Sequence, residues 1–175
     1  MSAVPAGAPG PLDPPAPRPR PADLCHVLAA LWGSLDPGDG GPGGTVDLDP
    51  APWPADPAVP LHLGQVDVDG PWRGRVVVAA DEVAAVRWAR AMLALGPDDE
   101  VTPEDVHDVV GELANVVAGA VKGHLPPGCR LGLPVVGRGT LGDPPPVPAD
   151  GGPVAAALAW PDARPAVLVV TVDGA

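Results

Sequence analysis

Residues 108–123, DVVGELANVVAGAVKG, constrain the fold most, because their apolar and polar side chains recur at helical spacing. At about 100° per residue, the apolar positions fall on one side of a helix and the polar positions on the other. The expected core side holds Val106, Val109, Val110, Leu113, Val117, Ala120 and Val121. The expected polar side holds Glu104, Asp108, Glu112, Asn115, Gly119 and Lys122. The stretch therefore predicts an amphipathic helix whose apolar side is buried.

A start signal for a helix precedes this stretch. Thr102 suits the N-cap, Pro103 suits the first helical position, and Asp105 stands where a capping box usually has Glu or Gln. Glu104 and Asp105 also suit the positive end of the helix dipole. The proline pair at 126–127 sets the latest possible end, so the sequence predicts one long helix from 103 onward.

Periodic segments on both sides of this helix predict the other elements. Apolar spacing predicts helices over residues 22–35 and 80–96, the second ending at Gly96. Strand patterns occur at 61–69, 74–80, 129–136, 153–160 and 166–172. The first two strands predict a β-hairpin, and the last two predict a terminal pair. This order predicts an α+β fold in which helices cover a mostly antiparallel sheet.

One segment of biased composition precedes the expected domain, and another lies within it. Residues 1–21 are rich in Pro, Ala and Gly and predict a disordered tail. Residues 36–60 are rich in Gly, Pro and Asp and predict a long, flexible loop. We therefore expect a single domain over residues 22–175.

The net charge of the chain argues against certain classes of binding partner. A net charge of −12 argues against nucleic acid and against anionic membranes as partners. No segment approaches the roughly 20 apolar residues of a membrane span, and no secretory signal is recognisable. Cys25 and Cys129 lack metal-ligand spacing and are expected to be reduced, structural thiols in a cytoplasmic protein.

The polar side of the long helix is the candidate functional site. Asp108, Glu112 and Asn115 are spaced i, i+4 and i+7, so they form one stripe, and Asn115 is the chain's only asparagine. A carboxylate and a carboxamide one turn apart can hold a partner and orient a water molecule. Gly111 and Gly119 each cost the helix roughly 1 kcal/mol relative to Ala. Both are expected on or beside the stripe, where a missing side chain lets a partner approach. A stripe of this kind can also be ordinary solvated surface.

The stripe and its surroundings resemble a known family. GELANVVAGAVKGHL followed by RLGLPVVGRG resembles the CheX branch of the CheC–CheX–FliY phosphatases of bacterial chemotaxis. The family motif is Asp or Ser, three residues, Glu, two residues and Asn, with a proline downstream. Asp108, Glu112 and Asn115 match the motif in order and spacing, and Pro134 is the candidate proline. The resemblance covers roughly residues 61–140 and implies a CheX-like α/β sandwich.

The resemblance also implies an activity. Such proteins dephosphorylate the aspartyl phosphate of a response-regulator receiver domain. By carry-over, Glu112 docks to the receiver's lysine and Asn115 orients the attacking water, while Asp108 supports the motif or contacts the partner. No cofactor or metal is expected on this chain, because the receiver supplies the Mg2+. Members with one motif often pair through sheet edges, so a homodimer is possible.

Two other interpretations stay open. A domain of the same fold could bind a receiver or another signalling protein without hydrolysing anything, or it could be structural and have no receiver partner. The four histidines, His26, His62, His107 and His124, show no ligand cluster, so structural or solvated roles are expected for them.

Overall fold

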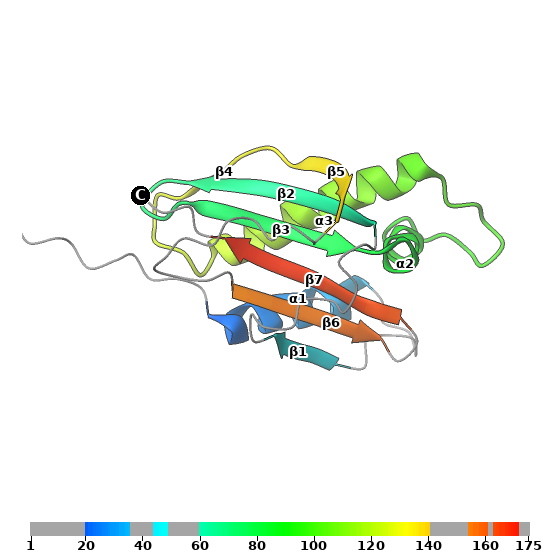
Figure 1. Ribbon diagram of the computed structural model, residues 1–175, viewed down its shortest axis with the longest axis horizontal. Helices are drawn as coiled ribbons and strands as arrows, with labels where there is room; N and C mark the ends of the chain where they lie inside the picture. Colours follow the sequence, from blue (N-terminus) through cyan, green and yellow to red (C-terminus); the bar gives the residue numbers. More distant parts are fainter. Residues whose placement is uncertain (1–19, 36–43, 49–59, 141–153, 161–162, 172–175) are drawn as a thin grey trace, which may run out of the picture.

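The computed structural model describes residues 20–35, 44–48, 60–140, 154–160 and 163–171 (Figure 1). The elements in chain order are α1 (Pro21–Leu35), β1 (Gly44–Leu48), β2 (Leu61–Asp69), β3 (Gly74–Ala80), α2 (Glu82–Met92), α3 (Pro103–Lys122), β4 (Arg130–Leu131), β5 (Val135–Gly139), β6 (Val154–Trp160) and β7 (Ala163–Thr171). The described strands form one sheet in the order β1-β6-β7-β3-β2-β4, and β5 also pairs with β2. Every strand pair in it is antiparallel, which confirms the predicted α+β fold.

The described helices gather on one face of this sheet (Figure 1). Helix α1 packs against β1 and β6, while α3 crosses β2 and β3. Helix α2 packs on α3 near the end of the sheet where β3 finishes. The core between the two layers consists of aliphatic side chains from these elements, together with Trp72 and Trp88.

Gly64 sets how closely α3 approaches the sheet. A Cβ atom at this position would lie 2.6 Å from the carbonyl oxygen of Val110 and 2.8 Å from the Cβ of Ala114. Any larger residue at position 64 would therefore push the helix away from the sheet. The backbone of α3 rests directly on β2, which holds the helix at a fixed height above the sheet.

The predicted start of α3 is confirmed. The Thr102 hydroxyl accepts a hydrogen bond from the Asp105 backbone N–H at 3.1 Å, and the Asp105 carboxylate accepts one from the Thr102 N–H at 2.8 Å. This reciprocal capping box satisfies two backbone donors at the start of the helix. The bond with Thr102 holds the pKa of Asp105 below its usual value. The two-sided pattern of α3 is also confirmed, except that Ala120, expected in the core, is exposed, whereas Ala114 and Ala118 are buried.

Several predicted boundaries are wrong. The expected loop at 36–60 contains β1, whose register on β6 runs from Gly44 opposite Ala159 to Leu48 opposite Ala155. Helix α2 ends at Met92 rather than near Gly96, because Ala94 adopts a positive φ of 53°. Strand β7 begins at Ala163, earlier than expected.

The expected tail and the third predicted strand also need correction. Helix α1 begins at Pro21, and Asp23 accepts a hydrogen bond from the Arg20 backbone N–H at 2.9 Å, so the expected tail ends before this point. Residues 1–19 lie outside the described part of the chain. The strand predicted at 129–136 is divided into β4 and β5.

A β-bulge divides that strand. Leu131 pairs with Val68, and Val135 pairs with Gln65. The edge segment therefore advances by four residues while β2 advances by three. The Gly132 N–H still donates to the Asp67 carbonyl at 2.8 Å. The next two residues, 133–134, therefore stand together opposite a single residue of β2, which interrupts the pairing.

Candidate functional site

The motif residues lie together on α3, as the spacing predicts. Asp108, Glu112, Asn115 and Gly119 are all exposed and occupy one stripe of the helix, which we call the motif stripe. Within the described part of the chain, no side chain forms a hydrogen bond or ion pair with Asp108, Glu112 or Asn115. These three polar groups are therefore available to a partner.

The helix behind the motif stripe is firmly held. Its opposite side buries Val106, Val109, Val110, Gly111, Leu113, Ala114, Val117, Ala118 and Val121. The capping box fixes its first turn, and the contact at Gly64 fixes its height above β2. Glu112 and Asn115 therefore project from a rigid support, as two groups that must act on one reacting centre require.

The two helical glycines of α3 differ. A Cβ at Gly119 would meet no heavy atom within 4 Å, so the helix surface is open at this end of the motif stripe. Gly111 is buried, and a Cβ there would lie 3.0 Å from the Val136 side chain of β5. The expectation that Gly111 opens the polar side to a partner is therefore wrong. Gly111 instead lets an edge strand pack against the helix.

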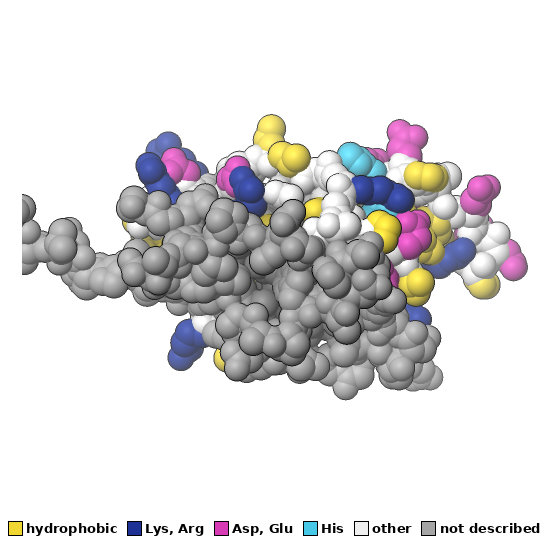
Figure 2. Space-filling model, in the orientation of Figure 1, with side chains coloured by type: hydrophobic (Ala, Val, Ile, Leu, Met, Phe, Trp, Pro, Cys, Tyr) yellow, Lys and Arg dark blue, Asp and Glu magenta, His cyan; other side chains and the backbone are white. Residues whose placement is uncertain are grey.

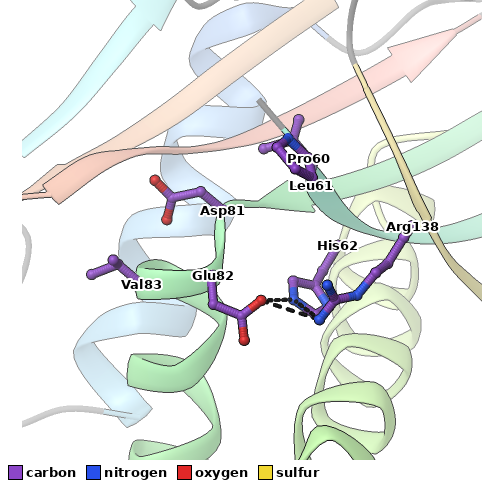
Figure 3. Close-up of a pocket in the computed structure, with 7 residues that line it drawn as sticks. All are labelled: Pro60, Leu61, His62, Asp81, Glu82, Val83 and Arg138. Carbon is purple, nitrogen blue, oxygen red and sulfur yellow. Dashed lines mark hydrogen bonds and ion pairs between the residues drawn. The ribbon is translucent and has the colours of Figure 1, made fainter. Parts of the chain in front are cut away.

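A second polar cluster lies where β2, β5 and α2 meet (Figure 3). The Nε2 atom of His62 is 2.9 Å from the Glu82 carboxylate, and the Arg138 guanidinium is 3.1 Å from the same carboxylate oxygen. The same guanidinium nitrogen of Arg138 is 3.2 Å from the imidazole Nε2. The three side chains point toward one another beside a cavity of about 330 Å³ that Asp81 and Val83 also line.

The burial of this cluster is uneven. The His62 side chain is 7% exposed, whereas those of Glu82 and Arg138 are each 61% exposed. The hydrogen bond with His62 holds the pKa of Glu82 below its usual value, and the nearby Arg138 charge acts in the same direction. The cluster therefore joins the edge strand β5 to the N-terminus of α2.

This cluster is not evident in the sequence. The structural role expected for His62 agrees with its burial, but its partners come from positions 82 and 138 and carry no common motif. The only signal that could have found them is the pairing of β2 with β5, which places His62 opposite Arg138.

The described residues hold neither a cluster of metal ligands nor a membrane-crossing helix. No group of three His, Cys, Asp or Glu side chains there could hold a metal ion. No helix in the same residues is both long and apolar enough to cross a membrane. Cys129 is buried against the Trp72 carbonyl at 3.8 Å, consistent with a structural thiol.

The central part of the chain resembles a known family in sequence. Residues 62–144 match the sequence model of the family described as "Chemotaxis phosphatase CheX". This segment holds the whole motif stripe, Pro134 and the His62 cluster. A curated relative, a leucine–tRNA ligase of Edwardsiella ictaluri, is 40% identical over an alignment of 103 residues that covers 54% of this chain. The chain spans 11% of the length of the ligase.

Solved structures share the fold. A chemotaxis protein CheX from Desulfovibrio desulfuricans has a TM-score of 0.59 at 13% identity, over 87% of this chain and 97% of that one. A CheX from Vibrio vulnificus has a TM-score of 0.58 at 22% identity, over 87% and 95% of the two chains. A structure described as a CheX–CheY–BeF3–Mg complex from Borrelia burgdorferi has a TM-score of 0.59 at 15% identity, over 87% and 97%.

Proposed function

We propose that this chain, whose residues 62–144 form a CheX-like domain of the CheC–CheX–FliY family, hydrolyses the aspartyl phosphate of a receiver domain. The family match supports a chemotaxis phosphatase-like role. The observation that carries the specific proposal is the motif stripe, where the exposed carboxylate of Glu112 and the exposed amide of Asn115 lie one turn apart on a rigid helix.

In the proposed reaction, α3 enters the receiver's phosphorylation site. Glu112 pairs with the receiver's lysine and fixes the docking geometry. The Asn115 amide holds a water molecule in line with the bond between phosphorus and the aspartyl oxygen. Attack by this water breaks that bond and releases inorganic phosphate and the free carboxylate. Amide positioning of water is an established way to accelerate phosphoryl hydrolysis.

The other parts of the proposal concern the partner. The Mg2+ required for the chemistry is held by the receiver, so this chain needs only to bind and to orient water. Asp108 and the open helix surface at Gly119 extend the contact along the motif stripe. Since response regulators act in the cytoplasm, the proposal places the chain there.

The test measures the decay of a phosphorylated receiver from the same cell with wild-type protein and with three variants. Asn115→Ala should reduce turnover by about 100-fold, the scale expected when a group that orients a reactant is lost, while binding is retained. Glu112→Gln should weaken binding and turnover together. Glu104→Gln, the same change on the polar side near the start of α3, is the matched control and should alter neither.

Three results would contradict the proposal. Unchanged turnover with Asn115→Ala would exclude its catalytic role. Measurable binding without faster decay in the wild type would identify an adaptor of the same fold. Failure to bind any receiver of the cell would favour a structural domain.

A further inference from the structure

We infer that Val136 of β5 is a positioning residue for the motif stripe, because it fixes the rotation of α3 about its own axis. This inference rests on the proposed function, since it concerns how Asn115 is aimed at the receiver's phosphoryl group. Val136 itself touches no reacting atom. The inference extends the site from one helix to the edge strand that supports it.

Helix α3 is supported at two places around its circumference. Beneath it, the backbone of Gly64 in β2 lies directly against Val110 and Ala114. At its flank, Val136 approaches so closely that a Cβ atom on Gly111 would lie 3.0 Å from the valine side chain. Gly64 and Val136 are paired across β2 and β5. One pair of sheet residues therefore makes both contacts with the helix.

The flank contact lies at the border of the motif stripe. At about 100° per residue, Gly111 lies about 60° from Asp108 and about 40° from Asn115 around the helix axis. Val136 is half-buried and packs against the core on one side and against this border on the other. A helix supported only from beneath can rotate about its axis. A second, close-packed contact at the border prevents that rotation.

The strand that carries Val136 is itself held in place. Arg138, two residues further along β5, points to the same face of the sheet. Its guanidinium is 3.1 Å from the Glu82 carboxylate and 3.2 Å from Nε2 of the buried His62. Figure 2 shows basic, acidic and histidine side chains together at the surface where β5 meets α2. Strand β5 therefore cannot move away from α3 without breaking these contacts as well as its pairing with β2.

The rotation of α3 matters because one helix stripe is too small to bind a receiver alone. Stable complexes bury about 800 Å² on each partner, so a receiver that covers Asn115 also meets the elements beside α3. Those elements fix the phosphoryl group relative to the whole surface. The rotation of α3 then decides whether the Asn115 amide holds its water in line, and a misplacement of about 1 Å can lower a rate about 100-fold.

The experiment measures kcat and KM for phosphate release from a phosphorylated receiver of the same cell. Val136→Ala removes the flank contact and should lower kcat by about tenfold, less than a full 1 Å misplacement would, with little change in KM. The matched control is Val135→Ala, the same substitution at the neighbouring residue. Val135 is 66% exposed and points to the opposite face of the sheet, so this variant should leave kcat unchanged.

A rescue separates positioning from loss of folded protein. Gly111→Ala alone forces a methyl group against Val136 and should also lower kcat. In the Val136→Ala background the same methyl group occupies the space that the valine leaves, so the double variant should recover most of the wild-type kcat. Such non-additivity is expected of residues in contact. Circular dichroism at the assay temperature establishes that each variant is folded.

The outcomes distinguish the inference from the proposed function. If the wild type is active and Val136→Ala has the same kcat as Val135→Ala, the inference is wrong and the proposed function stands. If the double variant is less active than either single variant, Val136 acts only through stability, and the inference is again wrong. If the wild type does not speed phosphate release, the phosphatase proposal fails and the inference fails with it.

Discussion

Replacing Gly119 by alanine tests whether glycine at the open end of the motif stripe lowers the stability of the helix. Glycine in a helix interior costs about 1 kcal/mol relative to alanine. Nothing lies within 4 Å of the position that a new Cβ would take. No steric clash should therefore offset the gain in helix propensity. Gly119→Ala should therefore raise the free energy of unfolding by about 1 kcal/mol and the Tm by about 3 °C.

Gly111 provides the matched comparison in the same helix. The propensity gain is the same, but the new Cβ would lie 3.0 Å from the Val136 side chain, which must then move. Overpacking of this kind typically costs 1–3 kcal/mol, so Gly111→Ala should be neutral or destabilising by up to about 2 kcal/mol. Gly64→Ala should be the worst of the three, because its Cβ would meet the Val110 carbonyl oxygen at 2.6 Å.

Urea denaturation of the three variants measures these differences at equilibrium. Equal effects of Gly119→Ala and Gly111→Ala would refute the assigned packing of β5 on α3. Gly119→Leu adds a functional test, since leucine also favours a helix. This variant should be at least as stable as the wild type and still lose receiver affinity if a partner approaches the helix there. Unchanged affinity would remove Gly119 from the docking surface.

The other predictions concern local polar contacts. Thr102→Ala should lower the free energy of unfolding by about 1 kcal/mol through loss of the cap, and hydrogen exchange should quicken in the first turn of α3. Hydrogen bonding to Arg20 lowers the pKa of Asp23 to about 2, so its contribution to stability is present at neutral pH. That contribution should be lost as the pH falls from about 4 to about 2, and Asp23→Asn should remove this acid dependence from urea titrations. Glu82, whose pKa is lowered mainly by its hydrogen bond with His62, should behave with the same sign. Since its side chain is 61% exposed, Glu82→Gln should cost less than about 1 kcal/mol at pH 7.

The parts of the fold that local sequence specifies could be predicted. The start of α3 depends on residues three positions apart, and its two sides depend on helical periodicity, so both follow from one short segment. The hairpin of β2 and β3 is equally local, because its strands are joined by a short turn at Gly70. The arrangement of Glu112 and Asn115 on one stripe needs nothing more than this helix.

The remaining features depend on contacts between distant segments. Strand β1 is five residues long and lies among glycines and prolines, and only its pairing with β6 makes it a strand. The bulge at Leu133 exists because β4 and β5 share the edge of β2 with one residue too many. His62 gains Arg138 as a neighbour through the same pairing. No periodic pattern in the sequence encodes these pairings, so they could not be predicted from it.

The strand order has a consequence for how the chain folds. In the sheet, β6 and β7 lie between β1 and β3. Strands β1 and β3 are therefore connected only through two strands that come later in the chain. Until the β6–β7 hairpin forms, β1 and β3 each present an unpaired edge, while the hairpin of β2 and β3 can already support α3. Pairing over such sequence separations slows folding and leaves edges open to intermolecular pairing. We therefore expect two kinetic phases, in which α3 gains protection from hydrogen exchange before α1 and β1.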